Sequence, residues 1–316
     1  MTSSIQVVLS WLQHLWNIEV TEATIITLSN SLVILLYVRF NKTSGRKSRK
    51  GKISNYLLLN QALTDLYIGF TVWYDIAFSQ HSDNNAVFLM KYAMLEYSLT
   101  LSLTTLLLGA LERYLAITRP FVHKSYVTFE RLVCATSTVW CFSLLTPLTL
   151  LSLMNFNAVL YLNHPHVVMY SYVFDCLMFL CICFSCAILL LTFKAANSSC
   201  TLRRKIGGTQ GNARLREQSM LINKQKKIRL VVIFICMMIG YILTFLPLMI
   251  GRLLYDAGVI RSLSMDEEIL LVTLIYFYKS SAILNPFLTM CRKDDYRRTL
   301  VGLVWRKNDK NLRIAL

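Results

Sequence analysis

Seven long apolar segments, separated by short connections, are the feature that most limits how this chain can fold. They cover approximately residues 24–40, 55–78, 87–117, 132–154, 167–193, 228–254 and 269–291. A helix needs about 20 predominantly apolar residues to cross the hydrocarbon core of a bilayer. Only 16% of the residues are charged and 55% are hydrophobic, a balance that soluble domains rarely have. The sequence therefore predicts an all-α membrane protein, a bundle of seven transmembrane helices.

The positions of the basic residues predict how this bundle is oriented. The 33 lysines and arginines lie at the first, third and fifth connections and in the C-terminal tail, except for Lys91, Arg252, Arg261 and Lys279. Because basic connections stay on the cytoplasmic side, we expect an extracellular N-terminal tail over 1–23, the seven-helix domain over 24–291, and a short amphipathic eighth helix with a cytoplasmic tail over 292–316. The net charge of +16 then attracts anionic lipid of the cell membrane, and no nucleic-acid partner is expected.

Ionisable side chains inside the apolar segments are the first candidates for function, because each is costly in hydrocarbon. They include Asp75 in the second segment, Glu96 in the third and Lys279 in the seventh. Asp175, near the start of the fifth segment, is expected to reach the membrane interface. A buried polar network, with or without a bound Na+, is predicted from the remaining polar groups: Asp65, Asn30, Ser102, Ser281 and Asn285.

Short motifs follow one another in order along the segments. From the first segment to the seventh they are Ser29-Asn30, Asn60 to Asp65, Glu112-Arg113-Tyr114, Trp140 with Pro147, Phe245-Leu246-Pro247 and Asn285-Pro286. Together they resemble the rhodopsin-like G-protein-coupled receptors over nearly the whole chain. The resemblance implies that the sixth helix, bent at Pro247, swings outward and that Arg113 then meets a heterotrimeric G protein. It also implies arrestin and a receptor kinase as further partners, and a receptor rather than an enzyme, with no catalytic group and no metal site.

The seventh segment carries a more specific pattern, Tyr278-Lys279-Ser280-Ser281-Ala282 followed by Asn285-Pro286. It resembles the signature of animal opsins, in which this lysine forms a Schiff base with retinal. The resemblance implies retinal, 11-cis or all-trans, bound to Lys279 and packed against Phe245. Burial favours the neutral amine that condenses with an aldehyde. Two alternatives stay open, namely a receptor for a diffusible ligand and a retinal photoisomerase that does not signal.

The chain departs from the opsin pattern where the counter-ion of the Schiff base is concerned. Lys91 occupies the position of the glutamate that many opsins use, and residues 154–174 contain no acid. Glu96 is therefore our first candidate for the counter-ion and Asp75 the second. The cysteines of the usual extracellular disulfide are also missing, and Thr289 replaces the tyrosine that ends the Asn285-Pro286 motif in relatives.

Overall fold

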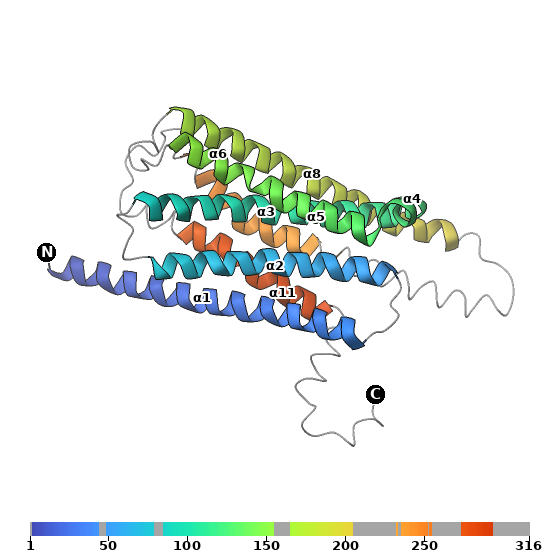
Figure 1. Cartoon of the computed structure of the whole chain (residues 1–316), viewed down its shortest axis with the longest axis horizontal. Helices are drawn as coiled ribbons and strands as arrows, with labels where there is room; N and C mark the ends of the chain where they lie inside the picture. Colours follow the sequence, from blue (N-terminus) through green and yellow to red (C-terminus); the bar gives the residue numbers. More distant parts are fainter. Residues whose placement is uncertain are drawn as a thin grey trace, which may run out of the picture.

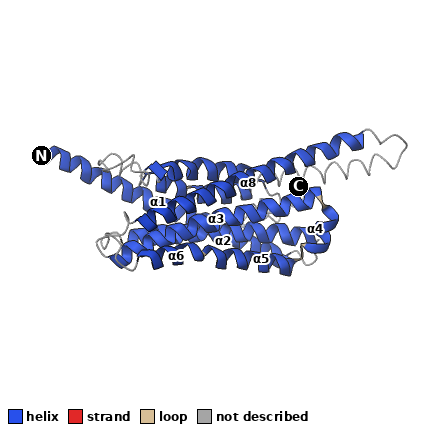
Figure 2. Cartoon of the chain, turned by 90° about the horizontal axis from the view of Figure 1, so that it is seen from above, coloured by secondary structure: helices blue, strands red, loops and turns tan. Residues whose placement is uncertain are grey.

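The computed structural model describes residues 2–43, 49–78, 85–154, 165–204, 232, 235–251, 253–254 and 273–292. All regular secondary structure within these ranges is helical (Figure 2), which agrees with the all-α prediction. The labelled helices are α1 (Thr2–Thr43), α2 (Arg49–Ala77), α3 (Asn85–Thr118), α4 (Pro120–Tyr126), α5 (Phe129–Ser143), α6 (Leu145–Met154), α8 (Pro165–Arg204) and α11 (Ser281–Arg292). Two unlabelled helices cover Ile235–Gly251 and residues 273–279.

The long helices lie side by side and alternate in direction (Figure 1). One end of the bundle holds the C-terminal ends of α1, α3, α8 and α11, the N-terminal ends of α2 and α5, and the short α4. We call it the basic end, because the sequence places the basic connections there. The shared location agrees with the charge pattern, and the prediction that this end faces the cytoplasm stays a prediction. Most of the predicted eighth helix and the tail lie outside the described residues.

Helix α3 forms the centre of the bundle and contacts α2, α5, α6 and α8, whereas α1 packs on α2 and α11. One apolar core joins α1, α2, α3, α8, α11 and the helix of Ile235–Gly251, and on α3 it includes Leu99, Leu103 and Leu106. A smaller apolar cluster packs α5 against α2. Large apolar side chains also cover the outward faces of the helices, for example Leu28 and Leu190. So much exposed apolar surface is expected where lipid rather than water surrounds a helix.

Four helical stretches are long and apolar enough to cross a membrane within the described part of the chain: Trp16–Arg39, Ala86–Thr118, Phe129–Ser152 and Val173–Ala195. A shorter apolar helix covers Ile235–Gly251. The first stretch begins eight residues before the predicted boundary at Thr24, and α1 itself begins at Thr2. Glu19 and Glu22 interrupt the apolar run in the sequence, but both face neighbouring helices and are buried. The predicted N-terminal tail is therefore helical from Thr2 and continuous with the first span.

The fourth predicted segment consists of two helices, α5 and α6, that meet at Leu144. Proline lacks the N–H that would bond to the carbonyl four residues earlier, and for Pro147 that carbonyl belongs to Ser143. The hydroxyl of Thr146 donates to the Ser143 carbonyl instead, at 2.9 Å. The interruption is thus a local consequence of Pro147 and leaves a continuous apolar span.

A glycine allows α1 and α2 to approach closely. A Cβ atom at Gly69 would lie 3.0 Å from Ile26 Cγ2 and 3.2 Å from Thr27 Oγ1. Small residues at such contacts are typical of helix pairs in membranes, where association depends on close packing. Further along α2, Trp140 of α5 donates through Nε1 to Asn60 Oδ1 at 3.0 Å. These contacts fix α2 between its neighbours and so position Asp65 and Asp75.

Candidate functional site

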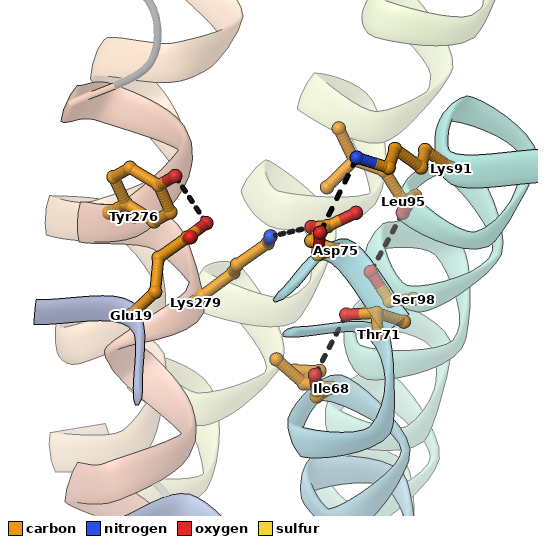
Figure 3. Close-up of polar contacts among 9 residues, drawn as sticks. All are labelled: Glu19, Ile68, Thr71, Asp75, Lys91, Leu95, Ser98, Tyr276 and Lys279. Atoms are coloured by element: carbon orange, nitrogen blue, oxygen red, sulfur yellow. Dashed lines mark hydrogen bonds and ion pairs between the residues drawn. The ribbon is translucent and has the colours of Figure 1, made fainter. Parts of the chain in front are cut away.

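Charged side chains from four helices meet near the end of the bundle opposite the basic end. Helix α1 supplies Glu19 and Glu22, α2 supplies Asp75, α3 supplies Lys91, and helix 273–279 supplies Lys279. We call these five residues the charged cluster, and Figure 3 shows four of them. Ionisable groups that lie together inside a membrane bundle indicate a functional site. The cluster is therefore the candidate site of this chain.

Lys279 lies inside the bundle, with only 3% of the residue exposed. Its ammonium group forms an ion pair and hydrogen bond with Asp75 Oδ2, which Figure 3 shows bridging the seventh helix and α2. The same nitrogen lies 5.6 Å from the centre of the Tyr276 ring, within the range of a cation–π interaction. Lys91 of α3 donates to the main-chain carbonyl of Asp75 at 3.5 Å. Asp75 thus contacts both lysines of the cluster, Lys279 through its carboxylate and Lys91 through its main-chain carbonyl.

The acid placed against Lys279 is Asp75, the second of the two predicted counter-ions. Glu96, the first, is fully buried on α3, and within the described residues no ion pair joins it to Lys279. Successive residues of a helix point about 100° apart, so Tyr278 and Lys279 face different neighbours. Tyr278 faces α3 and the helix of Ile235–Gly251, whereas Lys279 faces α2. Glu96 was preferred because its helix was expected to run through the centre of the bundle, and α3 does so, but Lys279 faces α2.

Phe245, the residue predicted to pack against a chromophore, belongs to an aromatic cluster beside Tyr278. Its ring stacks on Tyr241 at a centroid distance of 5.3 Å and meets Tyr278 edge-on at 6.2 Å. Tyr241 also contacts Tyr278, at 6.1 Å, and its hydroxyl donates to the Leu99 carbonyl of α3. These rings connect the seventh helix to α3 and to the helix that contains Pro247. The aromatic cluster adjoins the charged cluster because Tyr278 and Lys279 are consecutive residues.

Sequence reasoning missed two acids of the cluster, Glu19 and Glu22, and also Tyr276, the partner of Glu19. The hydroxyl of Tyr276 donates to Glu19 Oε1 (Figure 3). Glu22 interacts electrostatically with Lys279, which attracts it, and with Glu19, which repels it. A signal was available in the sequence, because Glu19, Glu22 and Asn30 are separated by helical spacings of three and then eight residues. That spacing puts both acids on the inward face of α1.

The seventh helix is interrupted beside Lys279. Residues 273–279 are helical, Ser280 is a turn, and α11 begins at Ser281. The Ser280 N–H donates to the Tyr276 carbonyl at 2.9 Å, but the Ile283 N–H donates to the Ser280 carbonyl, only three residues back, at 3.0 Å. Such tighter turns inside a helix often mark functional positions. Here the turn sets how the residues before it, Lys279 included, face relative to those of α11.

The polar network predicted around Asp65 forms in part. Both carboxylate oxygens of Asp65 accept from Asn285 Nδ2, at 3.2 and 3.0 Å, and one accepts from Gln61 Nε2 at 3.0 Å. Gln61 was not predicted as a member. Within the described part of the chain, no hydrogen bond connects Asp65 to Ser102 or Ser281, although both serines are buried. The network therefore joins α2 to α11 through one acid and two amides.

Asn30 contributes by a different route. Its Nδ2 donates to the Ala282 carbonyl at 3.2 Å and to the Ile26 carbonyl at 3.0 Å. Pro286 lies inside α11 and cannot donate to the carbonyl four residues earlier, which is that of Ala282. Asn30 thus satisfies the acceptor that Pro286 leaves free. The two motif residues Asn30 and Pro286 act together to join α1 to α11.

The Glu112-Arg113-Tyr114 motif lies at the basic end, where α3 ends. Arg113 Nη1 is 3.0 Å from Glu112 Oε2, and both side chains are buried. His123 of α4, which sequence reasoning missed, places Nε2 2.9 Å from Glu112 Oε1. Tyr114 packs against the edge of the apolar core. The carboxylate of Glu112 is therefore shared between the arginine of the motif and a histidine of the following helix.

Asp175 departs from its predicted place. We expected it to reach the membrane interface near the start of the fifth segment, but it is only 1% exposed in α8. Its neighbour Phe174 is buried in the apolar core, so this side of α8 faces the bundle. The prediction used only the position of Asp175 near the start of its segment. That position does not determine which face of the helix the side chain occupies.

Comparisons with known proteins identify the family. A search of the curated proteins found no match. The family model of the 7 transmembrane receptor (rhodopsin family) matches residues 29–288, which is most of the chain and includes every motif from Asn30 to Pro286. The match confirms the predicted fold of seven transmembrane helices, a membrane protein, and a signalling receptor rather than an enzyme. The chain belongs to the rhodopsin family of G-protein-coupled receptors.

Proposed function

We propose that this G-protein-coupled receptor senses light through retinal bound to Lys279 as a Schiff base, with Asp75 as the counter-ion. The observation that carries the proposal is the ion pair of the buried Lys279 with the partly exposed Asp75. A second support is the opsin-like run from Tyr278 to Pro286, which places this lysine seven residues before the motif proline. Within the family, a lysine held at this place needs a reason, because burying an amine in a membrane bundle is costly.

The residues present fit the attachment chemistry. Condensation with an aldehyde needs a primary amine that can give up its proton, and the carboxylate of Asp75 is in place to take it. A protonated Schiff base is a buried cation and needs a nearby anion, a role for which the same carboxylate is positioned. Bound retinal would supply light absorption and isomerisation. Tyr278 precedes Lys279 in the sequence and contacts Tyr241 and Phe245. We expect these three rings to pack against retinal.

Signalling would use the basic end. The ion pair of Arg113 with Glu112 holds the arginine inside the bundle, and its release would expose a cation to a heterotrimeric G protein. Pro247 has no backbone N–H to donate within the helix that carries Phe245, and we expect that helix to bend and move at this position. We propose arrestin and a receptor kinase as further partners, through the basic connections, and an N-terminus outside the cell.

Reconstitution with retinal tests the proposal. The full chain is expressed in membranes, mixed in the dark with 11-cis-retinal or all-trans-retinal, and its absorption spectrum is recorded before and after borohydride reduction. We expect a visible band and a covalent adduct that mass spectrometry maps to Lys279. Lys279→Ala should abolish the adduct. Asp75→Asn should shift the band, or lower the pH above which the Schiff base loses its proton and the visible band disappears. An adduct that persists in Lys279→Ala would contradict the proposal.

A receptor for a diffusible ligand is the second candidate, and the same ion pair favours it in one respect. The ammonium of Lys279 already has an anionic partner within the protein, so the pair is also suited to holding α2 and the seventh helix together in a resting state. Nucleotide exchange on a G protein separates the candidates: a light-dependent rise after retinal is added supports the first, and a rise only with added ligand the second. A light-isomerised adduct without any exchange would indicate the photoisomerase.

A further inference from the structure

A groove of about 580 Å³ lies between α1 and the seventh helix, beside the charged cluster. This volume is typical of small-molecule binding sites. Ile18 and Ile25 of α1 and Phe277 and Ile283 of the seventh helix form its apolar walls, and the first three of these are exposed on the outside of the bundle. The groove therefore opens toward lipid. An occupant would enter from the bilayer and must be largely apolar.

Glu22 gives the groove a charged wall. The residue is only 7% exposed, it lines the groove, and neither oxygen of its carboxylate has a hydrogen-bond partner within the residues that the structure describes. A buried carboxylate without a partner costs considerable free energy. In a groove that is open to the bilayer, a ligand that donates to Glu22 would offset this cost.

Three hydroxyl groups of the groove, those of Thr21, Ser280 and Tyr276, are suited to accept from a ligand that donates. The hydroxyl of Thr21 donates to the Asn17 carbonyl at 2.8 Å, and that of Ser280 donates to the Phe277 carbonyl at 2.7 Å. The hydroxyl of Tyr276 donates to Glu19. Since these three hydrogens are already engaged, the groove presents the free lone pairs of its hydroxyl groups together with those of Glu22.

The local charge balance favours a cation over a neutral donor. The charged cluster contains three carboxylates, those of Glu19, Glu22 and Asp75, and two ammonium groups, those of Lys91 and Lys279. Lys279 and Lys91 both contact Asp75, and Glu19 has the Tyr276 hydroxyl. Glu22 is the acid left without a contacting donor, so one added positive charge on the groove side would balance the described members of the cluster.

We infer that the groove between α1 and the seventh helix binds a cationic amphiphile, an apolar molecule with one protonated amine, whose ammonium group contacts Glu22. The chain or ring system of the ligand lies along Ile18, Ile25 and Phe277, and the ammonium donates to the carboxylate and to the Thr21 hydroxyl. This site is separate from the amine of Lys279, because Lys279 does not line the groove. It therefore does not depend on retinal.

Photo-crosslinking of the full chain in nanodiscs of neutral lipid tests the inference. The probe is a dodecylamine with a diazirine in its chain, and matched probes carry a hydroxyl or a carboxylate in place of the amine. We expect saturable labelling of α1 and of residues 273–283 by the amine probe, mapped by mass spectrometry and competed by unlabelled dodecylamine. The alcohol should label at least about tenfold less at equal concentration, since it lacks the charge. Equal labelling by amine and alcohol would mean that lipid chains simply fill the groove.

Variants make the test specific. Glu22→Gln removes the charge, and Thr21→Phe fills the groove without touching an acid; each should lower labelling by the amine about tenfold or more. The matched controls are Glu130→Gln, an exposed acid on α5, and Leu28→Phe, an exposed position two turns further along α1; both should label like the wild type. Unchanged labelling in Thr21→Phe would overturn the inference even if Glu22→Gln failed to fold.

One further variant separates this site from the proposed function. Lys279→Met removes the amine that would bind retinal but leaves the groove intact. Labelling by the amine probe should persist in this variant, or increase, because the negative charge near Glu22 is no longer opposed by Lys279. Loss of labelling in Lys279→Met would contradict a separate site, whatever the outcome of the retinal experiment.

Discussion

His123 Nε2 lies 2.9 Å from Glu112 Oε1, so the short helix α4 is bonded to the acid of the Glu112-Arg113-Tyr114 motif. The other oxygen of that acid holds Arg113 at 3.0 Å. One buried carboxylate thus links the arginine that would meet a G protein to the segment between α3 and α5. Any movement of α4 changes the partners of Glu112 and thereby the restraint on Arg113.

Removal of the histidine should raise basal signalling. In His123→Ala, one oxygen of Glu112 is left buried without a donor, which destabilises the resting arrangement relative to one that admits water. We expect a rise of about threefold to tenfold in ligand-free nucleotide exchange on a G protein, because a change of about 1 kcal/mol shifts a two-state population by several-fold. His123→Gln keeps a donor and should show a smaller rise. No change in His123→Ala at equal surface expression would show that α4 does not restrain Arg113.

The fold could be predicted because run length and motif order are properties of the sequence alone. The same criterion placed the start of the first segment at Thr24, whereas the apolar helical stretch begins at Trp16. Glu19 and Glu22 look like the end of an apolar run when their surroundings are unknown. Only the packing of α1 against the seventh helix shows that Glu19 accepts from Tyr276 and that Glu22 lies in the field of Lys279. Residue type therefore indicated which groups matter, and long-range packing decided which of them meet.

For the same reason, the sequence narrowed the partner of Lys279 to two acids but did not decide between them. Asp75 and Glu96 are both intramembrane acids near the right depth, and the sequence did not show which way Lys279 points. That direction depends on the rotation of the seventh helix about its axis, which the turn at Ser280 affects. His123 and Gln61 were missed because a single histidine or glutamine has no signal of its own until its partner, Glu112 or Asp65, is located.

The bond of Asn30 to the Ala282 carbonyl should be coupled to Pro286. Asn30→Ala leaves that buried carbonyl without its donor, and we expect a loss of about 1–3 kcal/mol in the free energy of unfolding. Pro286→Ala restores an N–H that can bond to the same carbonyl within α11. The double variant should therefore lose less than the sum of the two single changes. Thermal unfolding of purified protein in detergent measures all four states, and strict additivity would show that Asn30 does not serve the carbonyl freed by the proline.

Close packing of α1 on α2 should not tolerate a side chain at Gly69. A Cβ atom there would lie 3.0 Å from Ile26 Cγ2, a branch atom of a fully buried side chain that has little room to move. We expect Gly69→Ala to lower the free energy of unfolding by about 1–3 kcal/mol, the usual cost of overpacking. Gly240→Ala is a useful comparison, because its nearest contact is the end of the flexible Leu284 side chain at 3.2 Å. Thermal melting should show a smaller loss for Gly240→Ala, and the reverse order would contradict the packing described.

The ion pair of Lys279 with Asp75 should appear as a strong energetic coupling even without any ligand. Lys279→Met leaves the carboxylate of Asp75 without its partner, and Asp75→Asn leaves the ammonium of Lys279 without its partner. Each change should lower the free energy of unfolding by about 3 kcal/mol. This is the lower end of the cost of breaking a buried pair, because the Asp75 side chain is 23% exposed. The double variant removes both charges and should recover most of the loss. Glu96→Gln is the matched control: its effect should add to that of Lys279→Met, since the described ion pair of Lys279 is with Asp75 and not with Glu96. Melting temperatures of the five variants at neutral pH decide the matter. The counter-ion would be Glu96 instead if the effect of Lys279→Met were coupled to that of Glu96→Gln and additive with that of Asp75→Asn.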